Sequence, residues 1–412
     1  MSRALAEQPS LKLAQLRIQR AQAAAALVEA NAGLQVNGAA DLTRQRFSST
    51  GIYPPPLGGS IRTLASAQLG LAWEFDYFGR NRAALDAAIG QLRAARADRQ
   101  AARNLLAASV AQQWIQLARW GELRSVAVRT WAARQEILDL IKRRVQAGLD
   151  TRVELRQAEG ALPEAQQQIE LIDEQLSLTR HALAALAAQP PGSLDGVEVA
   201  LGQVALARPP TSLSADLLGR RADIVAARWR IEAAGSDVGQ AKAQFFPNIN
   251  LSAFAGLSSI GLDRLLRAGS EQYGVGPAIR LPIFDAGRLR ANLGVKTADL
   301  DAAVESYNAA VIDAVHEVAD AVASLRAIDR QQQEQALAQD AAESAWDLAD
   351  QRFKAGLSSY LVVLSAESQV LVQRRLAAEL KTRAMATQIA LVRALGGGYA
   401  PEPETRIAGE AP

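Results

Sequence analysis

Four stretches of the chain alternate apolar and polar residues with a period of two, the pattern of strands with one apolar face. They lie at residues 34–43, 68–76, 248–257 and 274–283. Each has about the 9–11 residues that a tilted strand needs to cross an outer membrane. Trp73, Phe75 and Tyr77 gather at one end of the second stretch, where a membrane aromatic girdle would lie. On the strands alone, two soluble hairpins packed on helices fit equally well.

Between these stretches, long segments rich in Ala, Leu, Gln and Arg contain no proline, which would break a helix interior. They predict two very long helices, at about 81–147 and 289–355, each spanning roughly 100 Å. Shorter helices are expected at about 10–32, 152–188, 215–243 and 360–395. Helices of such length are typical of coiled bundles and tunnels. The expected fold class is therefore mainly α with membrane β strands.

The two halves of the chain repeat each other at a fixed spacing. Gly79-Arg80 matches Gly287-Arg288, and the segment 144–149 (RVQAGL) matches 352–357 (RFKAGL), with 287 − 79 and 352 − 144 both giving 208. Upstream, Arg17-Ile18 matches Arg230-Ile231 at an offset of 213. Coincidental similarity of Ala-rich segments would scatter these offsets. We infer two copies of a unit made of helix, hairpin, very long helix, turn and helix.

This repeat divides the chain into consecutive segments. The expected segments are an N-terminal helix (1–33), a first β-hairpin (34–78), a long helix with turn and return helix (79–188), an equatorial segment (189–214), the first helix of the second repeat (215–246), a second β-hairpin (247–284), a second long helix with turn and return helix (285–395), and a C-terminal tail (396–412).

Charge and composition exclude several classes of protein. Lys and Arg number 45 and Asp and Glu 43, so the clustered basic excess of a nucleic-acid-binding protein is not expected. Cysteine is absent, and His181 and His316 have no partners at metal-ligand spacing. We therefore expect no enzyme activity, no metal and no cofactor. The sequence also contains no run of about 18 apolar residues that would form a transmembrane helix.

Four strands are too few to close a barrel, because single-chain outer-membrane barrels need about 8 or more. Their exposed edges must be paired by other subunits. A cyclic homotrimer would supply about 12 strands and a lumen.

Several motifs resemble those of TolC-like outer-membrane efflux proteins, in the lipoprotein branch that serves pumps of the resistance–nodulation–division (RND) type. They are, in chain order, WEFDYFGR at 73–80, RRADI at 220–224, AQFFPNINL at 243–251, LPIFDAGR at 281–288, and the segments 352–364 and 391–399. The resemblance spans about residues 8–399. It places strands at 34–47, 66–78, 247–259 and 273–284.

This resemblance implies a homotrimeric channel with a 12-stranded β-barrel in outer-membrane lipid, a periplasmic α-barrel and an equatorial region at mid-height. Such channels passively carry drugs or other small molecules from an inner-membrane pump and a periplasmic adaptor protein. Relatives begin with a signal peptide and a lipidated cysteine that this chain lacks, so N-terminal truncation is expected. The second turn also lacks the acidic residues common there, and Ala222 replaces a proline. A type I secretion exit duct and a soluble helical coiled-coil scaffold or adaptor protein remain alternatives.

The turns after the long helices are the candidate functional site, because by resemblance they form the closed periplasmic tip that meets the adaptor. The tip residues are Gly148, Leu149, Asp150, Thr151, Arg152, Glu154, Gly356, Leu357, Ser358, Ser359 and Tyr360. Both glycines fit helix C-terminal caps, and Thr151, Ser358 and Ser359 fit N-terminal caps. Three charged residues, Asp150, Arg152 and Glu154, would form a charged ring or inter-helix pairs, unless they only cap helices. Tyr360 is a candidate steric plug.

Three charged residues fall on the polar faces of the expected strands and are candidates for lining the barrel lumen. They are Glu74, Asp76 and Arg280. A solvated lining of the lumen is the favoured interpretation, and a role in selectivity is the alternative. Neither His181 nor His316 is expected to bind a metal or to have another functional role, because both fall on expected helices as surface or interface residues.

Overall fold

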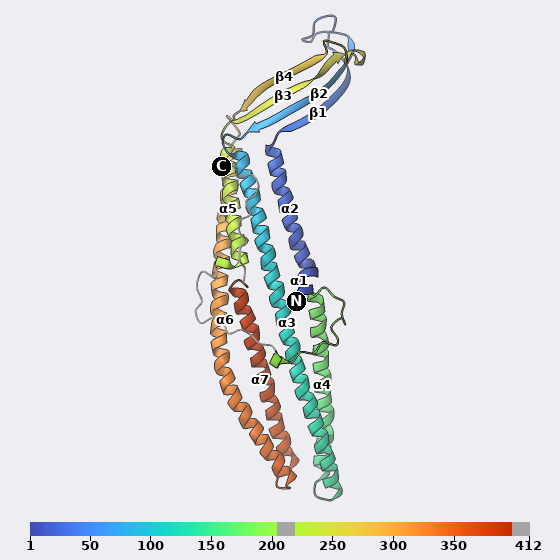
Figure 1. Ribbon diagram of the computed structural model, residues 1–412, viewed down its shortest axis with the longest axis vertical. Coiled ribbons are helices and arrows are strands. Elements are labelled where there is room, and N and C mark those ends of the chain that lie inside the picture. Colours follow the sequence, from blue (N-terminus) through green and yellow to red (C-terminus); the bar gives the residue numbers. More distant parts are fainter. Residues whose placement is uncertain (204–218, 398–412) are drawn as a thin grey trace. The chain divides into compact units, whose positions relative to one another are not determined.

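A computed structural model of the protein describes residues 1–203 and 219–397 (Figure 1). Its elements are, in order, α1 (Ser2–Glu7), α2 (Pro9–Ala32), β1 (Gln35–Arg46), β2 (Ile61–Phe75), α3 (Arg80–Gln146), α4 (Arg152–Leu186), η1 (Leu201–Gln203), α5 (Ala222–Ala243), β3 (Asn248–Ile260), η3 (Leu262–Arg264), β4 (Glu271–Arg280), α6 (Arg288–Lys354) and α7 (Tyr360–Ala394). The chain divides into two compact units. A strand unit comprises Leu16–Arg96 and Ala226–Asn308, and a helical unit comprises the remainder.

The predicted duplication is confirmed in the lengths and spacing of the helices. Helices α3 and α6 each contain 67 residues, and α4 and α7 each contain 35. Their starting positions repeat as well, since 288 − 80 and 360 − 152 both give 208. Gly79 and Gly287, which precede the two long helices, both have positive φ. Each repeat therefore turns into its long helix through a backbone conformation that glycine adopts without strain.

In the strand unit, four antiparallel strands form one sheet in the order β1-β2-β3-β4, which Figure 1 shows as neighbouring arrows. The hairpin of each repeat contributes two strands, and β2 joins β3 across the repeats. Pairing continues across all four strands in register. One row, for example, runs through Val36, Leu71, Ala253 and Val275.

One face of this sheet is apolar and the other is mostly polar, as the alternation predicts. The next apolar row joins Trp73 to Leu251 and Pro277. Pro277 lies on β4, which is an edge strand within the single chain, the place in a sheet where proline is most often found. The apolar side chains remain exposed within the single chain, with Val275 75% and Ile279 69% exposed. An exposed apolar face of this extent marks a surface that meets lipid or another subunit.

Three predicted strand boundaries are wrong. Strand β2 begins at Ile61 rather than residue 66, and the C-terminal ends of β2 and β4 differ for identifiable reasons. Strand β2 ends at Phe75 rather than residue 78, because the Asp76 carboxylate accepts the backbone N–H of Arg82 at 2.8 Å and starts the turn into α3. Strand β4 ends at Arg280 rather than residue 284, because Pro282 lacks the donor that would continue the ladder. Leu281, Ile283 and Tyr77 therefore lie outside the strands.

The first helix of the second repeat begins later than expected. Helix α5 starts at Ala222, and residues 219–221 are not α-helical. Asp223 lies in its first turn, where a carboxylate favours the positive end of the helix dipole. The expected helical residues 215–218 lie outside the described residues, as do 204–214 of the equatorial segment and 398–412 of the tail.

Helices α3 and α5 pack closely within the strand unit. The Arg93 guanidinium lies 4.5 Å from the ring centroid of Trp229. Gly90 lies so near α5 that an added Cβ would be 2.9 Å from the Cβ of Ala233. At Gly239 the same addition would lie 3.8 Å from the Cβ of Ala83, an ordinary contact. One helix pair thus contains an obligatory glycine and a replaceable one.

In the helical unit, the α3–α4 hairpin is held by an apolar cluster that includes Leu117, Ile169, Ile172 and Leu176. The described part of the equatorial segment packs on this unit. Leu201, in η1, joins a buried cluster with Ile115 and Met385, residues of α3 and α7. The two hairpins and the equatorial segment therefore share buried contacts within one unit.

The two glycines of the α3–α5 contact predict opposite effects of the same substitution. Gly239→Ala should stabilise the protein by about 1 kcal/mol, because alanine favours the helix and the added methyl fits. Gly90→Ala should lose that gain and cost about 1–3 kcal/mol through overpacking against Ala233. Thermal unfolding followed by circular dichroism of both variants in detergent measures the difference. Equal shifts in melting temperature would contradict the packing described for Gly90.

Candidate functional site: the paired hairpin turns

Both turns of the helical unit end a long helix in the same way. The N–H of Leu149 bonds to the carbonyl of Arg144 at 2.9 Å, and the N–H of Leu357 bonds to that of Arg352 at 2.8 Å. The intervening Gly148 and Gly356 have φ of 72° and 75°. This is the Schellman motif, in which a left-handed glycine lets the last carbonyls of the helix be satisfied. The predicted capping glycines are confirmed.

The starts of the return helices differ between the two turns. Thr151 and Glu154 form a reciprocal capping box at the start of α4. Hydrogen bonds from Thr151 hold the pKa of Glu154 below its usual value. At the start of α7, Ser359 occupies the N-cap position without a side-chain bond, and the buried Ser358 Oγ has no partner among the described residues. Ser359 is therefore at the predicted N-cap position, but neither serine forms a side-chain capping bond within the described chain.

The charged residues of the first turn pair locally. Asp150 accepts two hydrogen bonds from Arg144, at 2.8 and 3.0 Å, and these bonds raise the pKa of Arg144. The Arg144 guanidinium also lies 5.2 Å from the ring centroid of Phe353, on α6. Arg152 is exposed and forms no ion pair within the described chain. Of the three predicted charged residues, Asp150 pairs with Arg144 of α3, Glu154 caps α4, and Arg152 has no ion pair within the described chain.

An apolar cluster joins the two hairpins next to these turns. It combines Ile137 and Ile141 of α3 with Phe353 of α6 and Tyr360 of α7. The Tyr360 side chain is 1% exposed and its ring lies 5.9 Å from that of Phe353, and burial raises the pKa of Tyr360. A plug must project into open space, so the prediction of Tyr360 as a steric plug is wrong for this conformation. Leu149 and Leu357 instead project from the turns, about 70% exposed.

A buried ion pair lies beside this cluster and was missed from the sequence. Arg134 Nε donates to Glu367 at 2.9 Å, with side chains 8% and 10% exposed. Arg134 also donates to the carbonyl of Ala161 at 2.9 Å and approaches Glu164 at 3.5 Å. Burial raises the pKa of Glu367 despite the attraction of Arg134. Helical periodicity alone gives no signal that residues 233 positions apart will meet.

A second cluster, also missed, surrounds Arg221 at the start of α5. Its guanidinium bonds to Asp223, to Glu317 of α6 and to the carbonyl of Ala394 at the end of α7. Arg393 bonds to the other oxygen of Glu317 at 2.8 Å. Burial opposes ionisation of Asp223 and Glu317, but the arginines outweigh it and lower the pKa of each carboxyl. The RRADI motif at 220–224 drew attention to Arg221 in the sequence. The sequence did not indicate that Arg221 would contact Glu317 and Ala394.

The predicted lumen residues lie together in the strand unit. Glu74 forms an ion pair with Arg80 at 3.2 Å, and Asp76 caps α3. With Arg280 they line a cavity of about 660 Å³ where the sheet meets its helices. Of the predicted girdle, Trp73 and Phe75 contact each other edge to face at 5.7 Å, whereas Tyr77 packs on Phe78. Their membrane and lumen roles stay predictions.

The described residues contain no group of three or more His, Cys, Asp or Glu placed to hold a metal ion. Among the same residues, no helix combines the length and hydropathy needed to span a membrane.

Two very long helical hairpins, duplicated and joined to a four-stranded antiparallel sheet, define the class of TolC-like channel proteins. A family model described as "Outer membrane efflux protein" matches residues 1–189 and 213–397. The chain belongs to this family.

Individual relatives cover nearly the whole chain. The putative multidrug resistance outer membrane protein MdtQ of Escherichia coli K12 is 33% identical over 407 residues, covering 97% of this chain and 85% of the relative. The crystal structure of VceC from Vibrio cholerae superposes with a TM-score of 0.90 at 35% identity, covering 97% and 95% of the two chains. The open state of the Neisseria gonorrhoeae MtrE outer membrane channel gives 0.86 at 28% identity, covering 97% and 88%.

These findings confirm the recognised family, the fold class and the outer-membrane location with extension into the periplasm. The protein is an outer-membrane efflux channel, so the alternative of a soluble helical scaffold is wrong.

The buried ion pair predicts a non-additive pair of substitutions. Arg134→Met should destabilise the protein by about 3–5 kcal/mol, because it leaves the Glu367 carboxylate buried without its partner. The double variant Arg134→Met/Glu367→Leu should recover most of that loss, since both charges are removed. Melting temperatures by circular dichroism form the cycle. Additive losses in the double variant would show that the two side chains do not interact.

The Arg221 cluster predicts acid sensitivity. A carboxyl whose pKa is lowered by folding contributes stability above its unfolded value, about 4 for Asp and Glu, and loses it as the pH falls through the folded value. Asp223→Asn should therefore lower the melting temperature at pH 7 and have a vanishing effect as the pH falls below about 4. A difference from wild type that stays constant from neutral to acid pH would exclude the ionised carboxylate as its source.

Proposed function

We propose that three copies of this chain assemble into the passive outer-membrane conduit of a tripartite efflux system. The observation that carries this proposal is the sheet, in which β1 and β4 each have one unpaired edge in the described chain. Four strands do not close a barrel, whereas β4 of one copy pairing with β1 of the next gives about 12 strands. The exposed apolar face then meets lipid, and the polar face surrounds the lumen.

The segments take the roles that the repeat suggests. Hairpins 34–78 and 247–284 form the barrel, with Trp73, Phe75 and Tyr77 at its membrane boundary and Glu74, Asp76 and Arg280 towards the lumen. Segments 79–188 and 285–395, with the helices of 1–33 and 215–246, form the periplasmic α-barrel. Segments 189–214 and 396–412 form the equatorial region.

The proposed partners are a periplasmic adaptor protein and an inner-membrane pump of the RND type. A conduit has no energy source of its own, so a pump must drive transport. The exposed Leu149 and Leu357 on the turns offer apolar contacts to the adaptor. The proposed substrates are drugs or other small molecules. The multidrug resistance description of MdtQ supports this class over the secreted proteins of a type I exit duct.

We further propose that the turns close the resting conduit. The Arg144–Asp150 pair, its contact with Phe353 and the buried cluster hold the two hairpin ends together. Opening then requires these contacts to separate, because packed helices move between discrete arrangements.

Conductance measurements on the assembled protein test both proposals. Native mass spectrometry should give a trimer, and wild-type protein in planar bilayers should show a low resting conductance. Asp150→Ala should raise it by releasing Arg144, whereas Arg152→Ala, which removes an unpaired charge, should raise it less.

A monomeric protein without conductance steps would contradict the conduit. A trimer whose conductance is the same in wild type and Asp150→Ala would instead contradict only the charged closure of the tip.

A further inference from the structure

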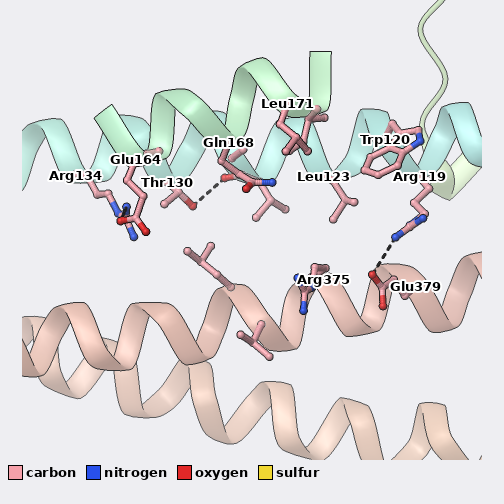
Figure 2. Close-up of a pocket in the computed structure, with 16 residues that line it drawn as sticks. Arg119, Trp120, Leu123, Thr130, Arg134, Glu164, Gln168, Leu171, Arg375 and Glu379 are labelled. Carbon is pink, nitrogen blue, oxygen red and sulfur yellow. Dashed lines mark hydrogen bonds and ion pairs between the residues drawn. The ribbon is translucent and has the colours of Figure 1, made fainter. Parts of the chain in front are cut away.

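A cavity of about 430 Å³ lies within the helical unit, between the α3–α4 hairpin and α7 (Figure 2). Figure 2 shows the Arg119–Glu379 ion pair as a dashed line at one end and Arg134 beside Glu164 at the other. At one end Arg119 Nη2 bonds to Glu379 at 2.9 Å, joining α3 to α7. At the other end lies Arg134, paired with Glu164 and with Glu367. The cavity is therefore a short compartment in the contact between the α3–α4 and α6–α7 helical hairpins, which we call the seam.

Its walls are largely apolar. Leu123 of α3, Leu171 and Ile172 of α4, and Leu371 of α7 line it, together with the ring of Trp120. A volume of this size falls in the range of small-molecule sites, which are mostly apolar with a few convergent polar groups.

The polar groups of the cavity leave positive charge unpaired. Of the three arginines that line it, Arg119 pairs with Glu379 and Arg134 pairs with Glu367. Arg375 forms no ion pair or hydrogen bond within the described chain, and it extends from α7 in Figure 2. The Nε of Arg119 is buried and has no hydrogen-bond partner among the described residues, although the same guanidinium holds Glu379 through Nη2. A buried donor without an acceptor is costly, so a bound acceptor would be stabilised there.

We propose that this cavity binds a small organic anion consisting of a carboxylate on an apolar, preferably aromatic, body. The carboxylate pairs with Arg375 and accepts from Arg119, and the body lies among Leu123, Leu371 and Trp120. The ligand contacts both hairpins, so its binding stabilises the seam. This site lies within one chain and does not depend on the conduit function.

Equilibrium dialysis of the full chain in lipid nanodiscs tests the site, with 2-naphthoate as the probe and empty nanodiscs as the background. Binding of 2-naphthoate should be saturable. Its neutral counterpart 2-naphthamide should bind about 10-fold more weakly, because it lacks the charge-assisted hydrogen bonds.

Matched arginine variants separate this site from general attraction of anions. Arg375→Gln should weaken 2-naphthoate binding about 10-fold and leave 2-naphthamide unchanged. Arg374→Gln removes the same charge from the adjacent residue, which pairs with Glu343 outside the cavity, and should leave both unchanged. Leu171→Glu places a repelling charge in the wall at a half-exposed position and should also weaken 2-naphthoate binding.

Any of three results would overturn the proposal. These are naphthoate binding no greater than that of empty nanodiscs, equal affinity for the acid and the amide, and equal losses in Arg374→Gln and Arg375→Gln. Conductance recorded on the same preparation distinguishes this failure from failure of the conduit, since a conducting channel can lack the anion site.

Discussion

Arg134 joins three helices through donors on a single guanidinium, bonding to Glu367 of α7 and to the carbonyl of Ala161 and the carboxylate of Glu164 on α4. A charge buried to this extent is tolerated only when it is paired, so the two hairpins are constrained to remain in register at this point. The apolar cluster around Phe353 and Tyr360 packs beside it. Separating the two helical hairpins would expose this cluster and leave a buried charge without its partner.

This constraint supports the proposed closure of the tip. The turns are positioned by their own caps, with glycine at the end of each long helix. The contacts between the α3–α4 and α6–α7 hairpins include the Arg144–Phe353 contact and the Arg134–Glu367 and Arg119–Glu379 pairs. The Arg221 cluster links the start of α5 with α6 and the end of α7 in the same unit. Helices that contact each other at a few such clusters can move as rigid bodies when those contacts break, and the proposed gate requires this kind of motion.

Much of the fold was readable from the sequence because local rules govern it. Absence of proline and the offset of 208 placed the long helices within about one residue of α3 and α6. Alternation identified the strands and their apolar face.

The ends of β2 and β4 were less predictable, because Asp76 and Pro282 end them through a cap and a missing donor. The capping glycines and Thr151 followed known motifs. The Arg134–Glu367 pair and the burial of Tyr360 did not, since they arise from contacts between repeats that no local pattern encodes.

Distance measurement between the two turns tests the central claim most directly. The chain has no cysteine, so spin labels placed by Leu149→Cys and Leu357→Cys report only these exposed positions. Pulsed electron paramagnetic resonance, with labelled protomers diluted in unlabelled ones, should give a single narrow distribution of distances between the two labels. Adding Arg134→Met should lengthen or broaden that distance together with a rise in resting conductance. An unchanged distance distribution in Arg134→Met would contradict the claim that the seam between the hairpins holds the tip closed.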